Sequence, residues 1–322
     1  FTQSSALKYI ASFTKRQTTT YALHLLMDYL LPHMGELNFK SKAYYLGYMV
    51  RKLLFVHMKM EPPTNRDKYS FKRIEVAGNL IYQLFVEYYN LQTKFIYSKI
   101  DEEYFWHKSD YKNEKFINVV MNKQKLVFGN RVVEEGFRKA FKGNWGSQPH
   151  TKRPGIVQDL NRLSFFSATC QLRKTNLYIS SAGAKVVNPR LLSPTQWGLL
   201  CPIHSPDGGN VGLHKHLATS THITSGCSMK PIVEYLLHPQ MNVKPLEECT
   251  FDFLALSSKV FVNGTWIGNT YKPLDLLERF KLHRRNNMIN IFTSIRFDYR
   301  NKEIIVFCDA GRPTRPLFYI TD

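Results

Sequence analysis

The densest group of potentially reactive side chains lies between Trp197 and Leu217, in the sequence WGLLCPIHSPDGGNVGLHKHL. This stretch contains one Cys, three His, one Asp and four Gly. Such a composition is compatible with a metal site, a phosphate-binding loop, a nucleophile or a rigid structural turn. Each of these possibilities requires a different spacing of the side chains.

A metal site would need ligands in suitable pairs. Cys201 and His204 have the spacing of one ligand pair, and His214 and His216 follow. Structural zinc sites use four ligands, often with a second pair spaced H-x3-5-H. The second pair here is H-x-H, so the spacing favours ordinary histidines and we expect no metal. A zinc hydrolase built on Cys201 and His204 is a distant alternative.

A phosphate-binding loop and a nucleophile are also poorly supported. The run SPDGGNVG lacks the Gly-Lys-Ser/Thr of a P-loop and the G-x-G-x-x-G of a dinucleotide fold. Pro206 follows Ser205, so no nucleophile elbow is present. We assign no catalytic residue. Proline and glycine instead predict a rigid, bent loop with Asp207 and Gly208 as a turn pair, suited to placement beside a nucleic-acid backbone.

The elements before this loop are predicted to be helical. Apolar residues recur at helical spacing over residues 18–34, 40–60 and 72–100, and Pro32 should end or bend the first of these helices. The apolar stripe of the third helix, which we expect to pack against neighbouring helices, consists of Leu80, Leu84, Tyr88 and Leu91. The paired tyrosines should likewise pack rather than recognise a ligand: Tyr44, Tyr45, Tyr88 and Tyr89.

Shorter elements follow. We expect short helices over residues 101–142, a loop over 143–155, a helix over 156–174 and a loop over 176–187. Asn263 and Gly264 predict a two-residue hairpin turn, because both positions need positive φ. A helix over residues 272–285 and two strands around a turn over 303–320 complete the pattern. The fold class is therefore α+β, a multi-domain piece with a mostly helical N-terminal half and a mixed α/β module at the end.

The net charge of +19 indicates a polyanionic partner, with scattered solvated lysines as the alternative. Residues 151–230 carry nine Lys or Arg against two Asp or Glu, which favours nucleic acid. No stretch is long and apolar enough to predict a membrane partner. Five widely spaced Cys without a CxxC indicate buried thiols in a reducing compartment. Because the chain starts at Phe1, we expect a piece of a longer protein.

The segment NPRLLSPTQWGLLCPIHSPDGGNVGLHKHL closely resembles the fork-region motif of the second-largest subunit of multisubunit DNA-directed RNA polymerases. The matching positions are Pro189, Arg190, Leu192, Trp197, Gly198, Cys201, Pro202, Pro206, Gly208, Gly212, Leu213 and Leu217. Weaker similarity extends over almost the whole chain and is of the eukaryotic, archaeal and large-DNA-virus type. His204, Ser205 and Asp207 depart from the usual Glu, Thr and Glu of the motif, which indicates a divergent relative.

The resemblance implies four parts: the end of the lobe domain (1–85), a returning segment of the protrusion (86–160), the fork (161–223) and external domain 1 (224–322). It places two fork loops at residues 143–155 and 179–186. The implied nucleic-acid-binding residues are Gln158, Arg162, Arg173, Lys174, Lys185, Arg190 and Asp207. Each basic residue could instead be a surface charge or an internal ion-pair partner. Asp207 is expected to form an Asx-type turn and to orient Arg190 or a neighbouring basic group, and Trp197 is expected to anchor a core.

The family's chemistry is nucleotidyl transfer through two metal ions. The resemblance implies that Mg²⁺ is held by the largest subunit, so this chain should bind no cofactor and should not polymerise RNA alone. The implied partners are the largest and other polymerase subunits, the DNA template and the RNA–DNA hybrid. The location would be the nucleus for a cellular enzyme, or the host cytoplasm or virion for a viral one. The alternative is a stand-alone basic nucleic-acid-binding protein without catalytic activity.

Overall fold

The computed structural model describes residues 2–109, 111, 116–179, 185–318 and 320. The chain forms two compact units, each assembled from separate segments. Unit 1 comprises residues 1–73, 193–199 and 220–322, and unit 2 comprises residues 74–192 and 200–219. The expected boundary between residues 85 and 86 lies within a continuous helix of unit 2, and the four-domain assignment stays a prediction.

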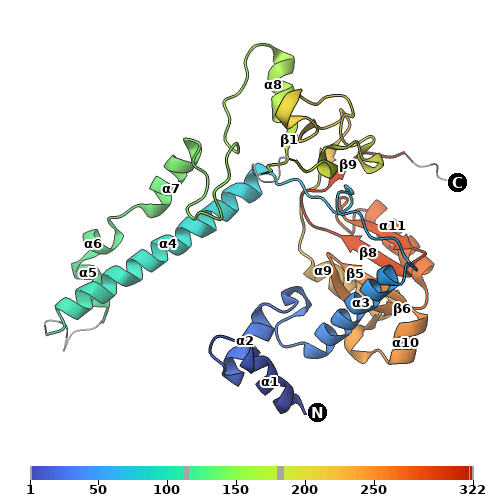
Figure 1. The fold of residues 1–322 in the computed structure, drawn as a ribbon, viewed down its shortest axis with the longest axis horizontal. Helices are drawn as coiled ribbons and strands as arrows, with labels where there is room; N and C mark the ends of the chain where they lie inside the picture. The colour runs from blue at the N-terminus through green and yellow to red at the C-terminus, as the bar shows by residue number, and fades with distance from the viewer. Residues whose placement is uncertain (1, 110, 112–115, 180–184, 319, 321–322) are drawn as a thin grey trace. The chain divides into compact units, whose positions relative to one another are not determined.

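Unit 1 is an α+β structure built on a five-stranded sheet. Its helices are α1 (Gln3–Ser12), α2 (Thr19–Asp28), α3 (Phe39–His57), α9 (Lys230–Leu237), α10 (Phe251–Leu256) and α11 (Pro273–Arg285). Its strands are β3 (His222–Ile223), β4 (Lys244–Pro245), β5 (Ser258–Val262), β6 (Thr265–Thr270), β7 (Ser294–Asp298), β8 (Glu303–Phe307) and β9 (Pro313–Thr314). The sheet has the order β4-β6-β5-β8-β7, with β5 and β8 parallel and the other pairs antiparallel. Figure 1 labels its three central strands, β6, β5 and β8.

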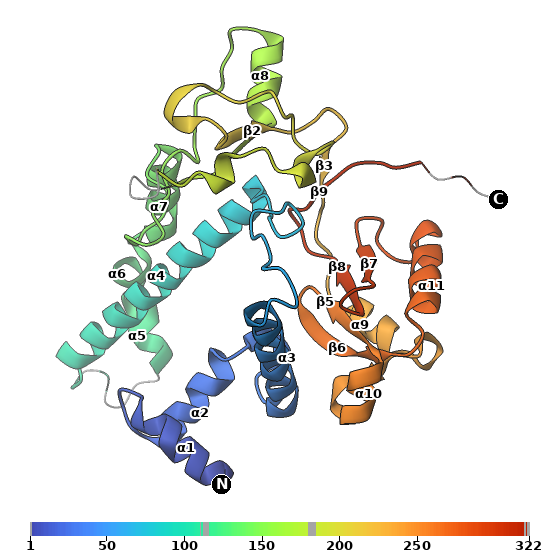
Figure 2. The same cartoon turned by 45° about the vertical axis from the view of Figure 1, so that its right-hand side comes forward.

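The two faces of the sheet pack against different helices. Successive side chains of a strand point to opposite faces. Val260 and Val262 of β5 therefore join a core with Leu236 of α9 and Phe280 of α11, whereas Phe261 faces the other way. Phe261 packs with Trp266 and with the tyrosines Tyr44, Tyr45 and Tyr48 of α3, and Figure 2 shows α3 beside β6.

A buried polar contact ties α3 to the sheet. The Tyr48 hydroxyl donates a hydrogen bond of 2.7 Å to Glu303 Oε1 of β8. Burial, together with the Glu303 carboxylate, raises the pKa of Tyr48 above its ordinary value. The phenol is thus kept protonated as a donor, and a buried carboxylate gains the partner that it needs.

Unit 2 is built along one long helix. Its helices are α4 (Ala77–Trp106), α5 (Phe116–Asn122), α6 (Gln124–Phe128), α7 (Val132–Phe141) and α8 (Phe165–Leu172), and its strands are β1 (Lys174–Asn176) and β2 (His214–His216). Helix α7 runs alongside α4 (Figures 1 and 2). The predicted stripe of α4 packs as expected: Leu84 and Tyr88 are buried in a core with Ala140 and Trp145.

The sequence predictions of fold are mostly confirmed, with two corrections. The α+β class, the early helices and the hairpin hold, and Asn263 and Gly264 have φ of 48° and 88°. The expected helix over residues 156–174 was wrong in extent, because it begins only at Phe165. Ser164 caps that helix by accepting a 3.1 Å bond from Ser167 N. The two strands expected over 303–320 form, but β9 pairs with β3.

Candidate nucleic-acid interface

The loop of residues 203–213 in unit 2 is held by its own hydrogen bonds. The Ser205 hydroxyl accepts a 2.8 Å bond from Gly212 N and donates a 3.2 Å bond to His214 O. Val211 N donates to Gly208 O at 3.1 Å, within the 3-10 turn Gly208–Asn210. The amides of Val211 and Gly212 thus donate hydrogen bonds within the loop, which makes the loop a rigid turn. A phosphate-binding loop would need such amides as donors, so that alternative loses two of them.

Arg190 fastens this loop from outside. Its Nη1 donates hydrogen bonds to Gly209 O at 2.7 Å and to Val211 O at 3.0 Å. Gly212 lies against the backbone of the same arginine, since a Cβ there would be 2.2 Å from Arg190 O. The Arg190 guanidinium therefore supports the loop, and any phosphate contact would compete with these carbonyls.

Asp207 does not act as expected. It stands at the N-cap of the 3-10 turn, but its side chain accepts no capping hydrogen bond. The expected Asx-type turn is therefore wrong, and the carbonyls of Gly209 and Val211, not the Asp207 carboxylate, orient Arg190. Asp207 is exposed to solvent. Glycine at 208, with φ of +76°, makes the bend without help from a side chain.

Arg173 and Lys174 lie where α8 meets β1. Arg173 Nη2 donates a 2.7 Å hydrogen bond to Ala218 O, and Arg173 O accepts a 3.0 Å bond from Leu217 N. Arg173 therefore links the C-terminal end of α8 to residues 217 and 218, which follow β2. Lys174 is half-buried opposite His216 in the antiparallel pair of β1 and β2. Its charge, after the larger effect of burial, lowers the pKa of His214.

The remaining predicted residues are exposed. Gln158 Nε2 donates a 2.8 Å hydrogen bond to Gly155 O, which stiffens the turn that ends residues 143–155. Arg162 and Lys185 are exposed, and neither forms an ion pair with another described residue. Of the seven residues, these two are the basic side chains most available to a phosphate. The second expected loop lies largely outside the described residues, since 180–184 are not described.

Sequence reasoning missed Glu87 as the anchor of the loop at residues 143–155. Its Oε1 accepts hydrogen bonds from Ser147 N (2.9 Å), Gln148 N (3.2 Å) and Thr151 Oγ1 (2.7 Å), and also from the Ser147 hydroxyl. Burial alone would raise the pKa of Glu87, but these donors outweigh it and lower the pKa. A carboxylate directly before the buried Tyr88 was the available signal.

The histidines of the motif form a stack, not a ligand set. The rings of His204 and His216 lie parallel, with centroids 3.5 Å apart and an interplanar angle of 3°. Burial and then the His204 ring lower the pKa of His216, which favours the neutral form. Within the described residues, no three His, Cys, Asp or Glu side chains gather as metal ligands.

Trp197, in unit 1, was expected to anchor a core, and this expectation was wrong. Its side chain is 60% exposed, and the buried residue beside it is Gln196. The chain turns at Gly198 with φ of +76°, which carries the indole outward. The four tyrosines mostly pack as expected, but Tyr89 is exposed and stacks on Phe85 with centroids 5.8 Å apart.

No helix in the described part of the chain is long and apolar enough to cross a membrane.

The chain matches three domains of one protein family: RNA polymerase Rpb2 domain 2 over residues 1–75, domain 3 over 158–223 and domain 4 over 260–321. The three matches follow the numerical order of the domains along the chain.

Similarity to individual proteins points to the same family. The chain is 35% identical to DNA-directed RNA polymerase II subunit RPB2 of Encephalitozoon cuniculi, over 99% of this chain and 28% of the relative. It is 34% identical to the same subunit of Schizosaccharomyces pombe, over 95% and 24%. It is 31% identical to the RNA polymerase subunit Rpo2 of Saccharolobus solfataricus, over 97% and 28%. The chain thus spans about a quarter of their length, and it belongs to the Rpb2 family of second-largest RNA polymerase subunits.

Proposed function

We propose that the chain works as part of a DNA-directed RNA polymerase, in which it forms the wall of the nucleic-acid cleft with loops 143–155 and 179–186 as the fork loops. The observation that supports this proposal most directly is that three Rpb2 domains match the chain in their numerical order. We also propose the four-part division 1–85, 86–160, 161–223 and 224–322. The relatives are eukaryotic and archaeal subunits, and we place a eukaryotic enzyme of this kind in the nucleus.

The proposed contribution of this chain is placement of strands, not bond chemistry. Exposed Arg162 and Lys185 would contact phosphates, which fixes position without reading sequence. Arg173 and Arg190 would act indirectly, through the backbone carbonyls of Ala218, Gly209 and Val211 that their guanidinium groups hold. Nucleotidyl transfer needs Mg²⁺, and the described residues offer no set of three ligand side chains for it. The metal would be held by the largest subunit, and this chain would supply no group that takes part in bond formation.

The test uses the assembled polymerase on a preformed DNA–RNA scaffold. The variant Arg162→Ala with Lys185→Ala should hold the scaffold less tightly, and the slope of log affinity against log salt should become shallower by about 0.7–0.9 for each lost phosphate contact. A matched variant, Lys68→Ala with Lys230→Ala, removes the same charge from exposed positions of unit 1. It should leave retention unchanged.

Equal scaffold retention, salt slope and elongation rate in the double variant and the native enzyme would refute the assignment of these two residues. Equal weakening in the matched variant would show that only total charge matters. Either result would leave the family membership intact.

A further inference from the structure

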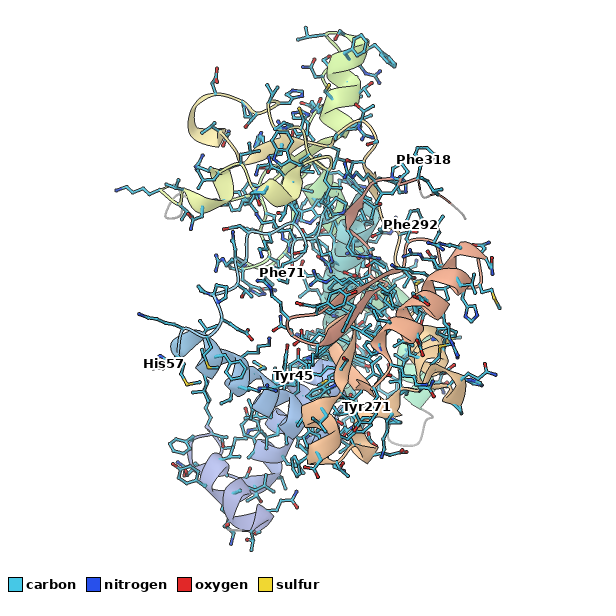
Figure 3. All side chains as sticks on the ribbon, turned by 90° about the vertical axis from the view of Figure 1, so that its right-hand side faces the viewer. Tyr45, His57, Phe71, Tyr271, Phe292 and Phe318 are labelled. Carbon is cyan, nitrogen blue, oxygen red and sulfur yellow. The ribbon has the colours of Figure 1, made fainter. Side chains whose placement is uncertain are left out.

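Unit 1 has a groove beside its edge strand β4. Its volume is about 370 Å³, and it is lined by Asn242, Val243, Lys244, Phe253, Tyr271 and Lys272. Edge strand β4 supplies Lys244, α10 supplies Phe253, and the junction between β6 and α11 supplies Tyr271 and Lys272. Figure 3 shows Tyr271 near α10 at the side of the sheet. We call this the Lys244–Lys272 groove.

The groove carries two positive charges, those of Lys244 and Lys272. Neither Lys244 nor Lys272 forms an ion pair within the described residues. The Lys244 ammonium lies over the Phe253 ring, 5.7 Å from its centroid. Two ammonium groups beside a concave surface, neither held in an ion pair with another described residue, attract an anion.

Aromatic rings form the other part of the lining. Phe253 and Tyr271 meet edge to face, with centroids 4.6 Å apart and an interplanar angle of 74°. Phe253 supports the Tyr271 ring, while the Tyr271 side chain itself is 59% exposed. An exposed aromatic ring beside lysines is the combination that binds single-stranded nucleic acid, because the ring stacks on a base and the lysines contact phosphates.

Buried hydrogen bonds fix the walls of the groove. Asn269 is fully buried, donates a 2.8 Å bond to Ser257 Oγ and accepts a 2.9 Å bond from Trp266 Nε1. Asn269 is also the β6 partner of Lys244. Lys272 N donates a 3.1 Å bond to Thr270 Oγ1. Walls positioned in this way lose little conformational freedom when a ligand binds.

We propose that the Lys244–Lys272 groove binds a short single-stranded nucleic-acid segment, with a base on the Tyr271 ring and a phosphate between the two lysines. The proposal stands apart from the fork assignment, because every groove residue belongs to unit 1 and every fork candidate to unit 2. An acidic peptide would satisfy the lysines but would leave the exposed ring without a role. A free nucleotide also offers a base and a phosphate, and the competition experiment below distinguishes it from a single-stranded segment.

The experiment uses the assembled polymerase and a single-stranded RNA octamer containing 4-thiouridine, with photo-crosslinks mapped by mass spectrometry. We expect crosslinks at Tyr271 or its neighbours. Lys244→Ala with Lys272→Ala should reduce them at least about 5-fold, whereas the charge-matched Lys68→Ala with Lys230→Ala should not. Tyr271→Ala should weaken groove occupancy about 5- to 150-fold, the range for one lost base stack, and Tyr271→Phe should preserve it.

Competition identifies the occupant. Displacement by excess unlabelled octamer, but not by uridine monophosphate or oligoglutamate, supports the single-stranded segment. Equal displacement by the mononucleotide at the same concentration keeps the groove as a nucleotide site and makes the free nucleotide its occupant. Displacement by oligoglutamate as good as that by RNA, or an absence of crosslinks near Tyr271, overturns the proposal. The fork variant Arg162→Ala with Lys185→Ala should leave these crosslinks unchanged, so the two proposals fail separately.

Discussion

Two glycines three residues apart in the loop of residues 203–213 differ in the space that they leave for a side chain. Gly212 has φ of +70°, and a Cβ there would lie 2.2 Å from Arg190 O. Gly209 has open space around it. We predict that Gly212→Ala destabilises unit 2 by at least about 2 kcal/mol, from backbone strain and steric overlap. Gly209→Ala should change stability by less than about 1 kcal/mol.

Thermal unfolding followed by circular dichroism, with protease cleavage between residues 203 and 213 as a local readout, measures both variants. Equal melting temperatures and cleavage rates for the two alanine variants would contradict the close approach of Gly212 to Arg190.

Arg190 and Arg162 differ in how their guanidinium groups are used. Arg190 donates to the backbone carbonyls of Val186, Gly209 and Val211, whereas Arg162 is exposed. We predict that Arg190→Ala costs about 1–2 kcal/mol, because the loop loses the charged donor that its carbonyls share. Arg190→Lys should cost nearly as much, since an ammonium cannot reproduce the fork of donors. Arg162→Ala should stay within about 0.5 kcal/mol in denaturant unfolding.

If Arg190→Lys proved as stable as the native chain, its charge and not its hydrogen bonds would be the relevant property. Arg190 would then rejoin Arg162 and Lys185 as a direct phosphate contact.

At the scale of elements, the loop of residues 143–155 is anchored to α4 by a carboxylate. Because the pKa of Glu87 is lowered in the folded state, its stabilisation is present above the ordinary value of 4.5 and is lost as pH falls through the lower, folded pKa. We predict that the protection of the Ser147 and Gln148 amides, measured as observed exchange relative to the intrinsic rate at each pH, falls below about pH 4.5. Glu87→Gln should show that loss of protection already at pH 7, with a cost of about 1–3 kcal/mol.

Glu75 offers the matched control, since it is a carboxylate of the same unit paired with Arg153 at 2.6 Å and exposed. Glu75→Gln should leave exchange at Ser147 nearly unchanged, because exposed ion pairs contribute little. Identical exchange in both variants would remove Glu87 from its anchoring role.

The sequence predicted elements best where a local signal was strong. Pro62 and Pro63 limit how far α3 can extend, and Asn263–Gly264 form the turn of the β5–β6 hairpin. Each of these signals acts through its own backbone. The start of α8 was misplaced although Ser164 is a good cap, since residues 156–163 are apolar enough to extend a helical pattern. The β3–β9 pair, two residues in each strand, has no period to detect.

The candidate site was predictable in type but not in detail. A motif identified Arg190 and the glycines, yet which atoms a guanidinium meets depends on backbone carbonyls that come together only in three dimensions. Glu87 and the Ser147 amide are 60 residues apart, so no local pattern joins them. Trp197 illustrates the reverse error, because its size alone predicted burial while the turn at Gly198 exposes it.

At the scale of the whole molecule, the net charge of +19 should govern non-specific association with DNA. We predict that binding of the chain to a random-sequence duplex falls linearly on a plot of log affinity against log salt, with a slope of about −0.9 for each phosphate contacted. Fluorescence anisotropy over a salt series measures this. A slope near zero would show that the charges are spread too widely to act together.

The discontinuous build of unit 1 has a consequence for the timing of synthesis. The tyrosines of α3 pack against Phe261 and Trp266, and about 220 residues separate Tyr48 from Trp266. At 5–20 residues per second, a ribosome takes about 11–44 s to supply that partner. The aromatic face of α3 therefore stays without its partner in the nascent chain while all of unit 2 is synthesised. We expect this face to be the segment that a chaperone most needs to cover during translation.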